Sequence, residues 1–202
     1  ERTLGYEIAQ KFLAPMVTAA ALLSESEKEL GSAVIDFGAG CTSVAVYKDG
    51  LMKHLAVIPI GGQHITNDLK SLKLLEQEAE KLKLMCGEKF SMRDKKVLKI
   101  ELPATAEGLE QRSVSTKDVE LIITARLHEI IDLVMSQIHK SGCADALNAG
   151  LVITGGVTNM KYVDEIVREK TGLEVRVGSY LAHLTETTND DFVRREYAQL
   201  VG

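Results

Sequence analysis

The segment from residue 33 to residue 50, AVIDFGAGCTSVAVYKDG, constrains the fold more than any other part of the chain. Its first apolar run closes at Asp36, glycines follow at positions 38 and 40, and a second apolar run leads into an Asp-Gly pair. Such a pair between two apolar runs is typical of a two-residue hairpin turn. We therefore predict three consecutive antiparallel strands over residues 32–37, 41–47 and 51–60, which is not how a fully parallel sheet begins.

The glycine bend between the first two strands suits a phosphate. Glycine lets the backbone approach a ligand closely because it has no Cβ, and consecutive amides in such a bend form a concave anion site. Asp36 would then hold a hydrated Mg²⁺ near the phosphates, since Mg²⁺ prefers oxygen ligands. A tight bend with a capping aspartate is the alternative, because Asp-x-Gly-x-Gly is a short and common pattern.

A second segment, GLVITGGVTNM at residues 150–160, also breaks from an apolar run into a glycine pair. The pair lets the backbone lie flat against a planar ligand, and the start of the following helix favours an anion. Taken alone, this segment fits a plain strand-to-helix turn better than a ligand site. Two such elements on either side of a helical insert favour one shared ligand site.

The remaining elements follow from apolar periodicity and capping residues. The helix at 117–139 has apolar residues at helical spacing along its length, whereas the Glu- and Lys-rich helix at 76–86 has the spacing of an exposed, ion-paired surface. We predict helices over residues 12–23, 64–74, 76–86, 117–139, 159–170 and 191–200, and further strands over 97–102, 150–153 and 174–177.

Composition excludes several classes of function. The net charge of −5 argues against a broad nucleic-acid surface, and 4% aromatic residues without tryptophan argue against a stacking platform for single strands. The three cysteines lie far apart and predict neither a disulfide framework nor a zinc site, which favours a reducing cytoplasm. No apolar run is long enough to cross a bilayer. Because the chain starts without methionine, we expect a piece of a longer protein.

Three motifs resemble the superfamily of actin, sugar kinases and DnaK-type chaperones. DFGAGCT resembles its second phosphate loop, VITGG its adenosine loop, and PMVTAAALL its interdomain helix. Within the superfamily the resemblance is strongest to the FtsA family of bacterial division proteins, in order and spacing across nearly the whole chain. It implies an α/β fold, half of an actin-like (ribonuclease H-like) ATPase domain, with subdomain 2A at residues 1–69 and 149–202 and an inserted α/β subdomain 2B at 70–148.

The resemblance implies a site for ATP and Mg²⁺. Asp36, on the metal side, Gly38 and Gly40 match phosphate-loop positions. Ala39 lies between the two glycines, and Thr42 beside them is the expected hydroxyl donor. The residues that match adenosine contacts are Gly155, Gly156 and Val157, together with Glu78 and Lys81 on the charged helix, for which a solvated, ion-paired face is the alternative.

The phosphate loop departs from the family pattern at two positions. Ala39 stands where glycine or aspartate is common, and Cys41 stands where many relatives have threonine. These changes keep the backbone amides but remove side-chain groups. We therefore expect at most weak ATP hydrolysis in the full-length protein. The resemblance implies that the first half of the fold supplies the other phosphate loop and the other metal-side carboxylate, so we expect weak or absent ATP binding, and no enzyme activity, in this chain.

The family resemblance also implies a partner surface on subdomain 2B for the short, partly acidic C-terminal tail of FtsZ. Arg126 matches the tail-binding position on the long helix, and Lys117 at the start of that helix is a second candidate. An arginine fork suits carboxylates. The alternative for Arg126 is a helix-surface ion pair with Glu129 or Glu120, which would contribute little.

For the full-length protein, the resemblance implies an ATP-binding scaffold that polymerises and tethers FtsZ filaments to the inner membrane at the division site. Its partners would be FtsZ, further copies of itself and other divisome proteins, with no nucleic acid. It would lie at the cytoplasmic face of the membrane, attached only through a C-terminal amphipathic helix that this sequence lacks. The alternatives are a PilM-like adaptor of pilus assembly and an actin-superfamily ATPase or kinase.

Overall fold

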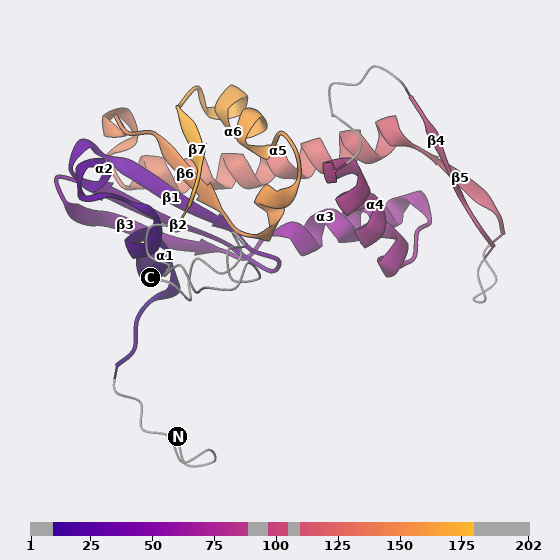
Figure 1. Ribbon diagram of the computed structural model, residues 1–202, viewed down its shortest axis with the longest axis horizontal. Coiled ribbons are helices and arrows are strands. Elements are labelled where there is room, and N and C mark those ends of the chain that lie inside the picture. The colour runs from indigo at the N-terminus through magenta and orange to yellow at the C-terminus, as the bar shows by residue number, and fades with distance from the viewer. Residues whose placement is uncertain (1–9, 89–96, 105–109, 180–202) are drawn as a thin grey trace, which may run out of the picture.

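The computed structural model describes residues 10–88, 97–104 and 110–179, and one part of it is built on a five-stranded sheet in the order β3-β2-β1-β6-β7 (Figure 1). The strands are β1 (Ser32–Phe37), β2 (Thr42–Lys48), β3 (Leu51–Ile58), β6 (Leu151–Thr154) and β7 (Val175–Val177). The first three are antiparallel neighbours, whereas β6 and β7 run parallel to β1. The predicted meander is confirmed. Its turn has positive φ at both Asp49 (54°) and Gly50 (70°), as the favoured two-residue hairpin turn requires.

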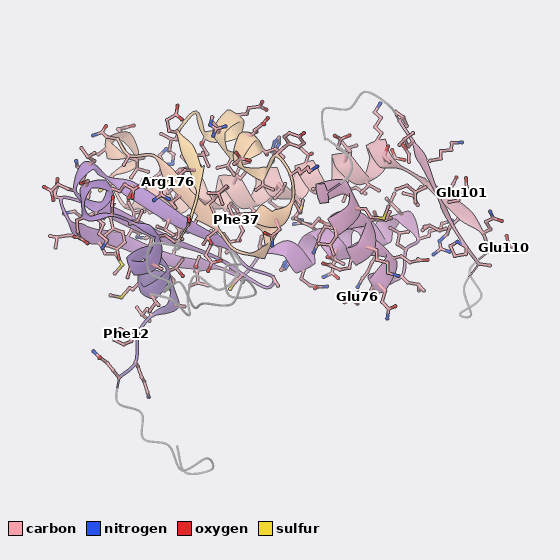
Figure 2. The ribbon with its side chains drawn as sticks, in the orientation of Figure 1. Phe12, Phe37, Glu76, Glu101, Glu110 and Arg176 are labelled. Atoms are coloured by element: carbon pink, nitrogen blue, oxygen red, sulfur yellow. The ribbon has the colours of Figure 1, made fainter. Side chains whose placement is uncertain are left out.

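Strand β1 is apolar on both faces because both faces of the sheet are covered. Ile35 and Phe37 point into the larger core with the long helix α5 (Thr116–Lys140), whereas Val34 packs in a smaller cluster with α1 (Ala14–Leu22). Phe37 has no exposed surface and lies inside the part of the molecule that holds the sheet (Figure 2). This buried strand fixes where the glycine bend leaves the sheet.

Helix α5 links the sheet to a smaller group of elements. Its apolar stripe is buried from Val119 to Ile138, as the helical spacing predicted. Near its end, Gln137 hydrogen-bonds His54 of β3 at 3.1 Å, and its first half packs against the other group (Figure 1). That group consists of α3 (Gly62–Leu69), the short helix η1 (Lys70–Leu72), α4 (Glu76–Glu88), β4 (Lys99–Leu102) and β5 (Arg112–Ser115).

Several predicted elements differ from the structure. The polar stretch after α1 forms a helix, α2 (Glu25–Leu30), because Ser24 and Glu27 make a capping box. The predicted helix at 159–170 begins later, as α6 (Val163–Thr171), and the short helix η3 (Gly156–Asn159) precedes it. Strand β5 is an additional finding, and so is the short helix η2 (Ala144–Ala146). The predicted helix at 191–200 lies outside the described residues.

Helix α4 is half-buried, so the prediction of an exposed, ion-paired helix is wrong for one of its faces. Ala79, Leu82 and Lys83 are buried, and the two apolar side chains belong to the main core. The division into subdomains 2A and 2B stays a prediction, and α5 contributes to both groups of elements.

Candidate nucleotide-binding site

The two glycine segments meet at one end of the sheet. Strands β1 and β6 are parallel neighbours, with Asp36 opposite Thr154, so both chains leave the sheet at their carboxyl ends. Gly155 follows directly, with φ of +92°, and a Cβ there would lie 2.5 Å from both Asp36 Oδ1 and the Phe37 carbonyl oxygen. Open α/β sheets bind ligands at the carboxyl ends of their strands. Here the close approach of residue 155 to Asp36 and Phe37 requires glycine.

The glycine bend is held in place by the start of α3. The amides of Gly62 and Gln63 donate to the carbonyls of Gly38 (2.9 Å) and Ala39 (2.8 Å). A Cβ on Gly61 would lie only 2.3 Å from the Gly38 oxygen. The first amides of this helix therefore fix the shape of the bend, while Ala39 and Gly40 at its tip are exposed.

Thr42 takes a different place from the one predicted. Its side chain has no exposed surface, and its hydroxyl donates to the Ile60 carbonyl at 2.8 Å. This bond ties the start of β2 to the segment after β3. Thr42 therefore supports the bend from inside, and the structure does not present its hydroxyl as a free donor.

A buried lysine on α4 lies beside the loops. Lys83 Nζ contacts Glu80 Oε2 at 2.8 Å, Thr66 Oγ1 at 2.9 Å and the Gly62 carbonyl at 3.3 Å, and the residue is 9% exposed. Burial alone would raise the pKa of Glu80, but its hydrogen bonds with Lys83 and Thr66 (2.6 Å) outweigh burial and hold that pKa below its usual value. Glu80 is therefore a carboxylate at neutral pH.

Around Gly62 these parts come into direct contact. A Cβ on Gly62 would lie 2.9 Å from Val157 Cγ2 and 3.8 Å from Lys83 Nζ. The glycine bend, the second glycine segment and α4 thus meet at one residue. Sequence reasoning missed Glu80 and Lys83, although the apolar pair at 79 and 82 indicates which face of α4 turns inward.

The two residues predicted on α4, Glu78 and Lys81, differ in their surroundings. Glu78 accepts a hydrogen bond from the Leu75 amide at 2.9 Å and forms an ion pair with Arg112 of β5, so its carboxylate is already engaged. Lys81 is exposed and lines a cavity of about 430 Å³ between α3 and α4, together with Gln63, Thr66 and Glu80. The structure therefore brings Lys81 to the side of the loops and gives Glu78 another partner.

Asp36 provides a carboxylate at this end of the sheet, in the last pair of β1 and β6. Within the described residues, no group of three or more His, Cys, Asp or Glu side chains could hold a metal ion. Mg²⁺ commonly keeps several waters and is held by one or two carboxylates plus substrate phosphates. An aspartate beside the glycine bend is compatible with that mode of binding.

The two predicted partner residues lie on opposite faces of α5, since nine residues place them about 180° apart on a helix. Arg126 Nε and Nη2 donate to Asp68 of α3 at 2.5 and 2.8 Å, and Nη1 donates to Glu129 at 2.5 Å. The bond with Asp68 raises the pKa of Arg126. Lys117 instead lines a groove beside α6. These residues do not form one site, and the ion pair with Glu129 that was the alternative for Arg126 is present.

The sheet order and the paired glycine loops define an actin-like ATPase fold. Among solved structures, MreB5 of Spiroplasma citri bound to ADP is similar, with a TM-score of 0.73 and 18% identity over 89% of this chain and 58% of that one. A PilM–PilN complex of type IV pilus biogenesis has a TM-score of 0.68 and 13% identity, over 95% and 50% respectively.

The chain belongs to the FtsA family of cell division proteins. The family model described as "Cell division protein FtsA" matches residues 33–202. FtsA of Neisseria meningitidis is 40% identical over 177 residues, and FtsA of Bacillus subtilis is 34% identical over 179, each over 87% of this chain. The chain spans about two fifths of the length of these relatives (42% and 40%). No described helix is both long and apolar enough to span a membrane.

Proposed function

We propose that this chain supplies one wall of the ATP site in an actin-like scaffold of bacterial cell division. The observation that carries the proposal is the meeting of two glycine loops beside Asp36, at the carboxyl ends of neighbouring parallel strands. MreB5, which shares the fold, was solved with ADP and with AMPPNP. Membership of the FtsA family adds the role in division.

In this proposal, each part of the site has its own task. The amides of Gly38, Ala39 and Gly40 bind the phosphates, and Asp36 holds Mg²⁺ through water. Gly155, Gly156 and Val157 lie against the adenosine, where Lys83 and Glu80 offer a donor and an acceptor from α4.

We propose a scaffold in preference to an enzyme. The exposed tip of the bend carries Ala39 and Cys41, neither of which offers a hydroxyl or carboxylate toward a phosphate. ATP would then act mainly as a ligand that sets conformation and assembly. The PilM structure is only 13% identical, so its similarity concerns the fold alone. The FtsA family match therefore favours a role in division over one in pilus assembly.

Titration of the full-length protein with fluorescent ATP, with and without Mg²⁺, tests the nucleotide proposal. Asp36→Asn should lower the Mg²⁺-dependent affinity about tenfold or more, as loss of metal-site groups does. Asp49→Asn, which removes the same charge from the exposed hairpin turn, is the matched control and should leave affinity unchanged. Equal affinity of both variants and the parent protein would overturn the role of Asp36.

The finer division role, polymerisation and tethering of FtsZ filaments to the inner membrane, is part of the same proposal for the full-length protein. Because Arg126 already has two carboxylate partners, an acidic tail would have to displace them. Binding of a labelled FtsZ tail peptide to Arg126→Gln and to Lys117→Glu separates the two faces of α5. Loss in only one variant assigns the tail to that face, and full binding by both contradicts both candidate residues.

A further inference from the structure

The first turn of α3 is closed by a histidine. The amide of Gly61 donates to Nδ1 of His64 at 3.1 Å, and the Gly61 carbonyl accepts from the His64 amide at 3.0 Å. The next two amides, of Gly62 and Gln63, are the ones that donate to the glycine bend. His64 therefore holds, through two hydrogen bonds, the residue that comes directly before the donors to the bend.

Gly61 is buried against the bend itself. A Cβ there would lie 2.3 Å from the Gly38 oxygen and 2.7 Å from the Ala39 oxygen. A trans peptide bond is planar, so the amides of Ala39 and Gly40 point away from the carbonyls of Gly38 and Ala39 respectively. The start of α3 holds both of these carbonyls. It thereby sets the direction of two amides that the proposed function assigns to the phosphates.

The bond to His64 depends on the protonation state of the ring. An amide N–H can only donate, so Nδ1 must accept, and the ring carries its proton on Nε2. A doubly protonated imidazole has two donors and no acceptor, and the buried Gly61 amide would then lose its partner. Glutamate or glutamine is the usual residue that makes this bond in a capping box. Histidine differs from both because it changes charge between about pH 5 and 8.

Charged side chains on α3, or in contact with it, form ion pairs with one another. They are Asp68 and Lys70 on or directly after α3, Glu76, Glu80 and Lys83 of α4, and Arg126 and Glu129 of α5. The glycine bend adds the exposed thiol of Cys41. The pKa of Glu80 is held below its usual value, so its pair with Lys83 stays charged over the range in which histidine titrates.

We infer that neutral His64 is a positioning residue of the nucleotide site, which holds the Gly61 amide and with it the phosphate-binding shape of the glycine bend. Protonation of the ring releases that amide and loosens the bend. The inference rests on the proposed nucleotide function and adds a dependence on pH to it. His64 acts through Gly61 and needs no contact with the nucleotide.

Titration of the full-length protein with fluorescent ATP and Mg²⁺, at about pH 8 and about pH 5.5, tests the inference. His64→Gln keeps an acceptor that does not titrate, and His64→Leu has none. Because phosphates also titrate in this range, the proteins are compared with one another at each pH. The parent should match His64→Gln at the higher pH and bind about threefold or more weakly than it at the lower pH. His64→Leu should bind weakly at both.

His139→Gln is the matched control, since it removes an exposed imidazole at the far end of α5, and it should follow the parent at both pH values. If the parent and His64→Gln bind ATP equally at both pH values, the inference is overturned and the nucleotide proposal stands. A parent protein that binds ATP at neither pH would overturn both. Nuclear magnetic resonance of the His64 ring at the higher pH should show the proton on Nε2, and a proton on Nδ1 would contradict the bond. Thermal melting shows whether each variant is folded.

Discussion

Replacement of Gly155 by alanine tests the geometry that joins the two glycine loops. Gly155 has φ of 92° and ψ of 167°, a region that is essentially open only to glycine. A Cβ would also lie 2.5 Å from the Phe37 carbonyl oxygen, which belongs to the backbone of a buried strand and cannot turn away. Strain of this kind costs about 1–3 kcal/mol, and overpacking adds about 1–3 kcal/mol. We expect Gly155→Ala to lower the free energy of unfolding by roughly 2–6 kcal/mol.

Urea unfolding followed by circular dichroism measures this loss, and the neighbouring glycine gives the control. A Cβ on Gly156 meets nothing within 4 Å, and its φ is not in the strained range. Gly156→Ala should therefore change stability by less than about 1 kcal/mol, in the stabilising direction, since alanine restricts the unfolded chain. A Gly155→Ala protein as stable as Gly156→Ala would refute the close approach of β6 to Asp36.

Two further predictions concern Thr42 and Glu27. Thr42→Val removes the donor to the Ile60 carbonyl and should cost about 1–2 kcal/mol in urea unfolding, with ATP affinity unchanged; lost affinity without lost stability would contradict this supporting role. Burial would raise the pKa of Glu27, but hydrogen bonds from Ser24 and Arg176 hold it below the usual 4.5. The ionised Glu27 carboxylate therefore makes its full contribution to the free energy of unfolding above pH 4.5. That contribution is lost as the pH falls through the lower pKa of the folded state. Glu27→Gln weakens these charge-assisted hydrogen bonds and should cost about 1 kcal/mol at pH 7. It should also reduce the fall in melting temperature as pH is lowered below 4.5; an unchanged fall would contradict the assignment.

The features that could be predicted from the sequence depend on local patterns. The Asp-Gly pair at 49 and 50 specifies its turn through backbone conformation alone, and the apolar stripe of α5 needs only helical spacing. The two glycine loops were expected to share a site, and the parallel pairing of β1 with β6 brings them together.

The features that could not be predicted depend on contacts between distant segments. Thr42 is satisfied by a carbonyl eighteen residues away, and Arg112 of the unpredicted strand β5 reaches the Glu78 carboxylate across 34 residues. The tetrapeptide RSVS of β5 has no run of β-branched or aromatic residues that would predict a strand. It becomes a strand through its backbone pairing with β4.

Helix α4 shows how such contacts decide the candidate site. Its glutamates and lysines have the spacing of exposed ion pairs, which directs attention to Glu78 and Lys81. The apolar residues Ala79 and Leu82 turn the helix so that the next lysine, Lys83, is buried against the Gly62 carbonyl. A lysine is seldom buried unless it is paired, and here Glu80 and Thr66 supply the pairing. The face of α4 that the core buries therefore decides which charged residue lies beside the glycine loops. In a charged helix, the apolar residues predict the buried face, and the charged residues alone do not.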